Sequence, residues 1–477
     1  MSRIFSFRQE TRLSYRSLNL VTFRACIILA SLAASPAALI GQEQNTQEQT
    51  HAPQILVVPA PLGGTSPQLL PTGEAEARNL LQGGVTVGTL FDDNAAAVGT
   101  QRHDEYQYFV LPSIAFQQTR PHTAWSLDYH GGITIQQAAV NSDTLTQNSN
   151  SASADLQHVF ARRLLLELRD DYVRTNNPFD STQGQSPATL SGVGQLNPFL
   201  AVPAATRIAN VSLGSLTYQL TRHSSTGIGG SYSSQRFHDV SSPAGLVSLI
   251  DTRAAAGKWF YVYEISQSQR IGFEYQVQDL RFQGSAARTL DQTLFLFDQI
   301  TLQSNMTLTL FAGPDRTHLH DNLLLRPNAS ASVVPTINDI WFPAGGATFM
   351  WRGRYLAMRL TGQRLVTDGS GSTGAVRATS ASAELRKDFT RKWTISLGYL
   401  YSEGQLLGGL GGAANSRITV GQGSLILERR LAEHFVVRAQ YARVQQVSAG
   451  APAPLTTGNH NRVGLEVAYQ FARPLGR

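Results

Sequence analysis

Residues 462–471, near the end of the chain, alternate strictly between two kinds of side chain. Successive side chains of a β-strand point to opposite faces, so this segment predicts a strand with one apolar face and one polar or small face. The apolar face carries Val463, Leu465, Val467, Tyr469 and Phe471, and the other carries Arg462, Gly464, Glu466, Ala468 and Gln470.

The same alternation recurs from residue 82 to the end of the chain without a break in composition. Alternation and turn chemistry predict about eighteen strands, with sixteen to eighteen acceptable. We expect them near 83–91, 106–118, 122–136, 151–160, 163–174, 207–220, 223–235, 252–265, 269–282, 289–302, 305–312, 342–351, 354–366, 377–389, 392–403, 416–430, 433–447 and 460–472.

The connections between these strands alternate in length. Short turns such as 161–162 and 431–432 follow every second strand, whereas longer loops such as 175–206 and 313–341 follow the others. Outer-membrane barrels place short turns on the periplasmic side and longer loops outside. A soluble β-helix, propeller or tandem sandwich also alternates, but does not regularly combine short and long connections in this way. The pattern therefore predicts an all-β fold, a transmembrane antiparallel up-and-down β-barrel.

The first 41 residues have the composition of an export signal. Five arginines precede or enter an apolar run at 25–34, and small residues follow it. The only cysteine, Cys26, lies in this segment and would leave with it. Removing five arginines and Glu10 from the totals leaves 34 basic and 32 acidic residues, so the high pI belongs largely to the signal. A nucleic-acid partner is therefore not expected.

Residues 42–81 are rich in glutamine and proline. Such a composition buries too little apolar surface to fold alone, which predicts a flexible periplasmic lead-in. The expected organisation is a signal peptide over 1–41, this segment over 42–81, and a barrel over 82–477.

With these features the chain resembles a Gram-negative outer-membrane β-barrel protein of the porin type over residues 82–477. The export signal, the alternating connections and the final strand carry the resemblance. It implies the cell outer membrane as location, with membrane lipid and the barrel-assembly machinery as partners and a homotrimer as one assembly. One departure is that residues 472–477 follow Phe471, whereas such barrels typically end on an aromatic residue that the assembly machinery recognises.

In general porins the third outer loop folds into the lumen and narrows it. Here that loop is 175–206, the longest predicted, and it contains Asn-Pro-Phe twice. The resemblance makes it the candidate pore constriction, although Asn-Pro-Phe is equally a stiff turn with an apolar clasp. The candidate constriction residues are Asn177, Phe179, Asp180, Asn197 and Phe199.

Several charged residues fall opposite the apolar faces, where they would avoid lipid. Their mixed sign predicts weak ion selectivity if they line a pore, and the alternative is that they pair across strands and hold the wall together. The candidate lumen-facing charges are Glu274, Arg359, Glu384, Arg386, Glu428, Arg438, Arg462 and Glu466.

The sequence contains no Gly-x-Ser-x-Gly nucleophile elbow, and its histidines are scattered, so we expect neither an enzyme nor a cofactor or metal. The Asp92-Asp93-Asn94 run fits a calcium loop or an ordinary polar turn equally well. The leading hypothesis is a channel for passive diffusion of small polar solutes. The alternatives are an exit channel for a secreted polysaccharide, whose sugar hydroxyls polar wall residues would suit, and a structural or surface-binding barrel with a closed lumen.

Overall fold

The structure, a computed structural model, describes residues 79–94, 104–138, 144–175, 206–238, 250–283, 288–321, 336–367, 374–407, 417–449 and 458–474. No helix among the described residues is long and apolar enough to span a membrane. The described residues form eighteen strands: β1 (Leu80–Asp92), β2 (Glu105–Thr119), β3 (Thr123–Ala138), β4 (Thr144–Ala161), β5 (Leu164–Thr175), β6 (Thr206–Gln219), β7 (Ser224–His238), β8 (Thr252–Ser266), β9 (Gln269–Phe282), β10 (Arg288–Gln303), β11 (Met306–Asp321), β12 (Thr336–Arg352), β13 (Leu356–Thr367), β14 (Val376–Asp388), β15 (Trp393–Leu406), β16 (Arg417–Arg430), β17 (Phe435–Ala449) and β18 (Gly458–Pro474).

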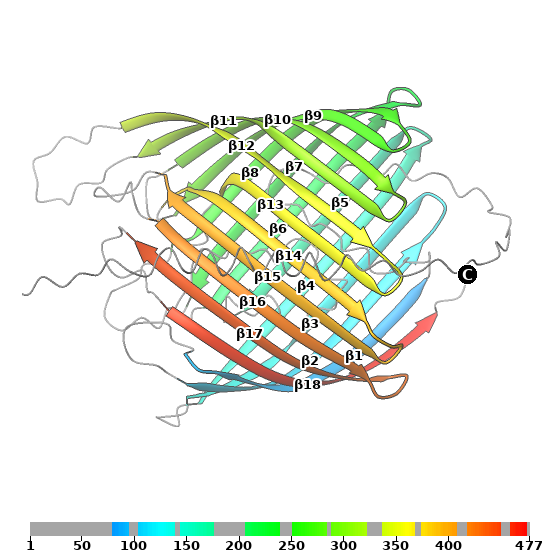
Figure 1. Cartoon of the computed structure of the whole chain (residues 1–477), viewed down its shortest axis with the longest axis vertical. Coiled ribbons are helices and arrows are strands. Elements are labelled where there is room, and N and C mark those ends of the chain that lie inside the picture. The colour runs from blue at the N-terminus through cyan, green and yellow to red at the C-terminus, as the bar shows by residue number, and fades with distance from the viewer. Residues whose placement is uncertain are drawn as a thin grey trace, which may run out of the picture. The chain divides into compact units, whose positions relative to one another are not determined.

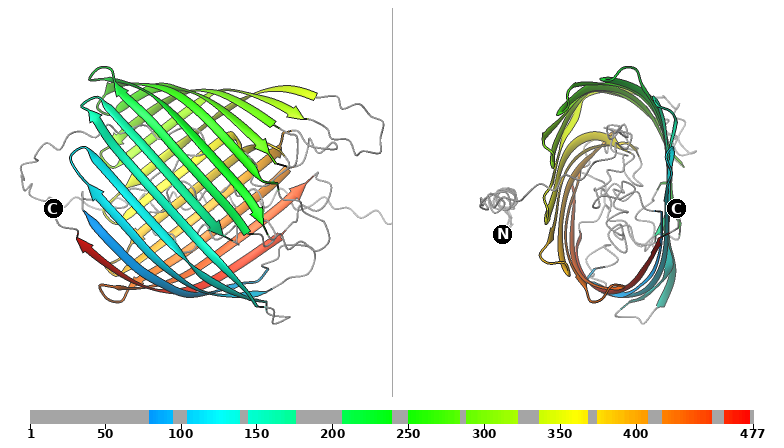
Figure 2. Two further views of the ribbon diagram at one scale, coloured as in Figure 1. Left: turned by 180° about the vertical axis from the view of Figure 1, so that it is seen from behind. Right: turned by 90° about the vertical axis from the view of Figure 1, so that its right-hand side faces the viewer.

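Each strand pairs antiparallel with its neighbours in sequence, and the first strand pairs with the last (Figure 1). The closing β1–β18 ladder runs from Leu80 opposite Pro474 to Asp92 opposite Arg462. All eighteen strands therefore form one continuous ring, which the view along its axis in Figure 2 makes visible. The predicted all-β antiparallel up-and-down barrel is confirmed.

The two faces of this ring differ sharply in exposure. On β10, Leu296 is 66% exposed whereas the preceding Phe295 is 1% exposed. On β18 the exposed set is the predicted apolar one, Val463 to Phe471, and Glu466 and Ala468 between them are buried. Because a closed barrel crowds side chains on its concave side, we call the exposed apolar side the outer wall and the occluded side the inner face.

The outer wall has the composition of a surface in contact with lipid. Its exposed side chains are predominantly Val, Ile, Leu, Phe, Tyr and Trp, including Trp125, Trp259 and Tyr399. An antiparallel barrel has no open edge and satisfies its backbone hydrogen bonds between strands, which is the condition for crossing a bilayer with strands. The architecture is therefore that of an outer-membrane protein, in agreement with the location expected from the sequence.

Three strands are much longer than predicted. β4 begins at Thr144 rather than near 151. The sequence predicted a loop over 313–341, but β11 continues to Asp321 and β12 begins at Thr336. The reason is that these extensions carry no alternation of polarity, and one of them holds Pro314, a residue that strand interiors rarely contain. Pro314 lies directly opposite Pro343 in the β11–β12 ladder.

A close approach between β10 and β11 requires glycine at position 313. A Cβ there would overlap the carbonyl oxygen of Leu294 on the neighbouring strand. The regular β10–β11 pairing is interrupted at this point, between Thr293–Asp315 and Leu296–Ala312. A glycine inside a strand commonly marks such a close backbone approach.

We expect Gly313→Ala to lower the free energy of unfolding by about 1–3 kcal/mol, because the backbone oxygen in its way cannot rotate aside as a side chain can. The matched control is Gly257→Ala on β8, since no atom lies within 4 Å of the position its Cβ would take. Urea unfolding of the lipid-folded barrel, followed by tryptophan fluorescence, measures both. Equal midpoints for the two variants would contradict the close approach.

Candidate functional site

The candidate constriction residues from the sequence, Asn177, Phe179, Asp180, Asn197 and Phe199, lie outside the described residues. The structure does describe all eight candidate lumen charges. Each lies on the inner face of its strand, in alternation with exposed apolar residues of the outer wall. The inner face of the barrel is therefore the candidate functional site.

One row of charges crosses three neighbouring strands. Glu428 lies opposite Arg438 in the β16–β17 ladder, and Arg438 lies opposite Glu466 in the β17–β18 ladder. The Arg438 guanidinium lies 2.9 Å from Glu428 Oε2 and 4.0 Å from Glu466 Oε2. Gln440 Nε2 donates a further hydrogen bond to Glu466 at 3.2 Å. One guanidinium thus interacts with two carboxylates on the two neighbouring strands, because the register places all three residues side by side.

A second ion pair lies at the closure of the barrel. Arg462 on β18 donates from Nε to Asp92 Oδ2 on β1 at 2.6 Å, and both side chains are buried. Beside them, Asp93 accepts hydrogen bonds from the backbone N–H of Asn461 at 2.6 Å and from its side-chain amide at 2.7 Å. Asp92 and Asp93 therefore bind residues of the last strand. This arrangement agrees with the interpretation of the acidic run as a polar turn.

The remaining candidate charges also have partners of opposite sign. Glu274 lies 3.6 Å from the ammonium of Lys258 on the adjacent β8. Arg359 and Glu384 face each other across the β13–β14 ladder at 3.9 Å, and Arg386 lies 3.7 Å from Asp388 on its own strand. Cross-strand pairing, the role that the sequence favours for most of these charges, is the arrangement observed at this wall, except that Arg386 and Asp388 lie on one strand.

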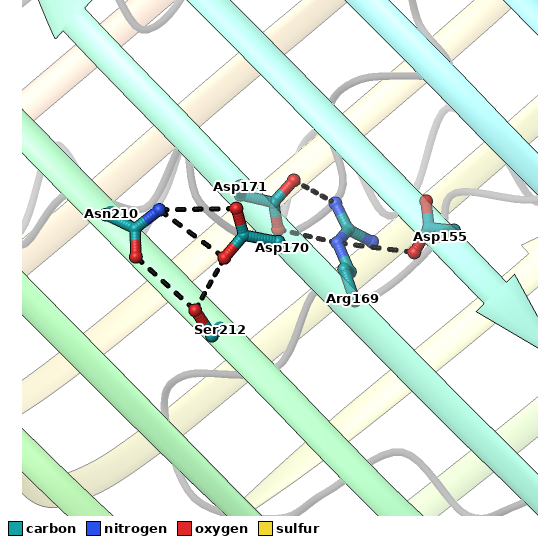
Figure 3. Close-up of polar contacts among 6 residues, drawn as sticks. All are labelled: Asp155, Arg169, Asp170, Asp171, Asn210 and Ser212. Carbon is teal, nitrogen blue, oxygen red and sulfur yellow. Dashed lines mark hydrogen bonds and ion pairs between the residues drawn. The ribbon is translucent and has the colours of Figure 1, made fainter.

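A charge cluster that the sequence did not single out lies on β4 and β5. Arg169 Nε donates to Asp171 Oδ2 at 2.6 Å and lies 3.6 Å from Asp155 Oδ1 on the neighbouring strand. Figure 3 shows this cluster together with Asp170, which points the other way and accepts hydrogen bonds from Ser212 and Asn210. The charged run Arg169-Asp170-Asp171 is visible in the sequence. Three consecutive charges, however, do not show which side chains face inward and which face outward.

Two more carboxylates were missed as a pair because they lie on different strands. Asp291 on β10 and Asp315 on β11 share the hydroxyl of Thr317, at 2.8 and 3.4 Å, and all three side chains are buried on the inner face. Thr293 donates a further bond to Asp291 at 3.3 Å. Among the described residues, no basic side chain forms an ion pair with either carboxylate, so this patch of the wall is acidic.

The inner face is not polar throughout. An apolar patch, contributed by β8 and β10 to β12, lies beside the acidic pair, and Phe295 and Phe311 within it meet edge to face at 5.4 Å. These phenylalanines make this part of the inner face apolar. The patch includes Phe260, Phe295, Phe297, Phe311 and Phe342.

Taken together, the inner face offers paired charges, hydroxyls and one acidic patch beside phenylalanines. No group of three or more histidine, cysteine, aspartate or glutamate side chains suited to a metal ion occurs in the part of the chain that the structure describes.

No family model and no curated protein matches this sequence. Among solved structures, the chain is similar to Acinetobacter baumannii OccAB4, with 12% identity, a TM-score of 0.39, and coverage of 83% of this chain and 98% of that one. It is also similar to Pseudomonas aeruginosa OccK3 (OpdO), with 12% identity, a TM-score of 0.38, and coverage of 82% of this chain and 96% of that one. A third similar structure is the apoprotein of the FrpB iron transporter from Neisseria meningitidis (F5-1 variant). Its identity is 10% and its TM-score 0.39, with coverage of 82% of this chain and 81% of that one. Similarity at this level does not carry a function from those proteins to this chain.

We expect Arg438→Ala to destabilise the barrel by about 1–3 kcal/mol, because it leaves Glu428 and Glu466 without their shared cation. The control is Arg391→Ala, in the exposed turn between β14 and β15, which should change the free energy of unfolding by less than about 0.5 kcal/mol. Urea unfolding in lipid vesicles measures both. A stable Arg438→Ala variant would mean that this row of charges is solvated rather than structural.

Proposed function

We propose that this protein is an outer-membrane channel through which small polar solutes diffuse passively. The observation that carries the proposal is the contrast between the two faces of one closed ring: an apolar outer wall and an inner face of ion pairs and hydroxyls. Barrels of sixteen to eighteen strands have the circumference to hold an aqueous channel. A charged inner face is favourable only where it is hydrated or paired, and here it is paired strand by strand.

The pairing suits passage rather than tight binding. A solute that moves along the wall meets charges already balanced by neighbours, as at Arg438, so no single site holds it strongly. Conduction requires binding that is favourable enough to enter and weak enough to leave. Amide groups between the pairs, such as that of Gln440, can replace part of the water shell of a polar solute.

The acidic patch gives the channel a preference of sign. Asp291 and Asp315 have no basic partner among the described residues, whereas the eight candidate lumen charges have partners of opposite sign. Two buried carboxyl groups in hydrogen-bond contact share one proton, so the pair adds one negative charge. An uncompensated negative charge on the wall raises the local concentration of cations and lowers that of anions. We therefore expect a weak preference for cations, and for cationic solutes whose apolar part can lie against the neighbouring phenylalanines.

The loop over 175–206 remains the proposed constriction, as the resemblance to porins implied. Most of it lies outside the described residues, so its place in the channel is a matter for experiment.

The refolded chain from Gln42 to Arg477 should give steady single-channel conductance in a planar bilayer, and deletion of residues 176–205 should raise it. The physical reason is that removing material from the narrowest section lowers the resistance of a water-filled pore. A shift between heated and unheated samples on a gel verifies that each form is folded. Silence of the correctly folded protein in both forms would overturn passive diffusion in favour of a closed barrel.

Replacing both carboxylates of the acidic patch, as Asp291→Asn with Asp315→Asn, should lower the permeability ratio of cations to anions by roughly twofold, because only the patch charge is removed. The control is Asp170→Asn, which removes a carboxylate from the outer wall and should leave the ratio unchanged. Reversal potentials in a KCl gradient measure the ratio. Identical potentials for all three proteins would place the patch outside the ion path.

A further inference from the structure

A groove of about 700 Å³ crosses the outer wall over β8 to β12. Its outward-facing lining is apolar, with Tyr261 and Tyr263 of β8, Phe273 of β9 and Leu296 and Leu310 among its residues. A volume of this size is typical of small-molecule sites. These strands are successive in the sheet (Figure 1). The groove therefore follows a continuous part of the wall. We call it the outer-wall groove.

One carboxylate lines this apolar surface. Asp298 on β10 alternates with Leu296 and Ile300 on the outer wall, where the sequence pattern would place an apolar residue. Gln269 Nε2 donates to both of its oxygens, at 3.2 and 3.0 Å. No basic side chain of the described residues forms an ion pair with it. A carboxylate at the lipid side of a membrane strand that has only an amide donor can still accept a cationic partner, and such a partner would stabilise it.

The position of Asp298 in the wall limits what that partner can be. Gln269 is the first residue of β9 and follows the short turn after β8, and Asp298 lies five residues before the end of β10 at its own short turn. Asp298 therefore lies toward the short-turn end of the barrel, close to one bilayer surface. Lipid headgroups of that leaflet are the cationic groups within reach of a side chain on the outer wall.

We propose that the outer-wall groove binds a phospholipid with a primary ammonium headgroup, a phosphatidylethanolamine, whose ammonium pairs with Asp298 while an acyl chain lies along the groove. A primary ammonium has three donors that a carboxylate can accept, whereas a choline headgroup has none. The acyl chain covers the apolar lining, as Leu296 and Leu310 require. The inference needs the outer wall to face lipid but does not depend on whether the barrel conducts.

Asp170 provides the comparison within the same molecule. It also lies on the outer wall, but Ser212 Oγ donates to it at 2.5 Å and Asn210 Nδ2 at 3.4 Å, and it does not line the groove. Its carboxylate is thus served by hydroxyl and amide donors of the protein. Of these two outer-wall carboxylates, Asp298 is the one that lines the groove.

The test is native mass spectrometry of the refolded full mature chain in detergent, titrated with dioleoyl phosphatidylethanolamine or dioleoyl phosphatidylcholine. We expect the ethanolamine lipid to be retained roughly twofold to fivefold more than the choline lipid, the factor that one partly exposed ion pair supplies. Asp298→Asn should remove this preference, and Asp170→Asn should keep it. Equal retention of both lipids by the unaltered chain, or an unchanged preference in Asp298→Asn, would overturn the proposal.

A second variant tests the groove itself. Ala312→Trp places a large side chain in its lining and should lower retention of both lipids, because the acyl chain loses its place. The heat-dependent shift on a gel reports that each variant is folded, independently of lipid binding. Unchanged retention in folded Ala312→Trp, or a dimer of chains that this substitution splits, would show that the groove does not hold the lipid.

Discussion

The structure depends on the closing ladder between β1 and β18. Inside a bilayer no water is present to satisfy an exposed backbone edge, so a sheet that crosses it must close on itself. Thirteen residue pairs join the first strand to the last, and the ion pair of Arg462 with Asp92 and the bonds of Asp93 to Asn461 reinforce the loop-side end of that ladder. All other strands have sequence neighbours on both sides. Only this pairing joins elements separated by most of the chain.

Closure of the barrel places the two faces of each strand in different environments, one outside the ring and one inside it. The outer wall keeps Leu, Val, Ile and aromatic side chains exposed, as lipid contact requires, and the inner face collects the charges. Charges in the interior are stable because the register places opposite signs side by side, as at Glu428, Arg438 and Glu466. The same register produces the acidic patch, where the carboxyl groups of Asp291 and Asp315 meet each other and the hydroxyl of Thr317, with no basic partner among the described residues. Stability and the proposed selectivity therefore both follow from cross-strand pairing.

The exceptions to the two-face rule are informative for the same reason. Phenylalanines on the inner face of β8 to β12 and carboxylates on the outer wall at Asp170 and Asp298 each break the two-face pattern. Asp170 finds its donors within the protein, whereas Asp298 has one amide and an apolar groove. Residues that depart from the alternation of apolar and polar faces are expected at functional sites.

The sequence by itself determined the number of strands, their approximate bounds and the face on which each residue lies, because a period of two depends only on neighbouring positions in the chain. Val463 to Phe471 and the eight candidate charges could be assigned to faces on this basis alone. It did not determine which charges meet: Asp155 with Arg169, or Asp291 with Asp315 through Thr317, depends on the register between strands. The sequence also did not predict the extensions of β4, β11 and β12. A strand segment whose two faces do not differ in polarity shows no alternation in its sequence. The groove beside Asp298 required the tertiary structure for a further reason, because its shape is made jointly by residues on successive strands.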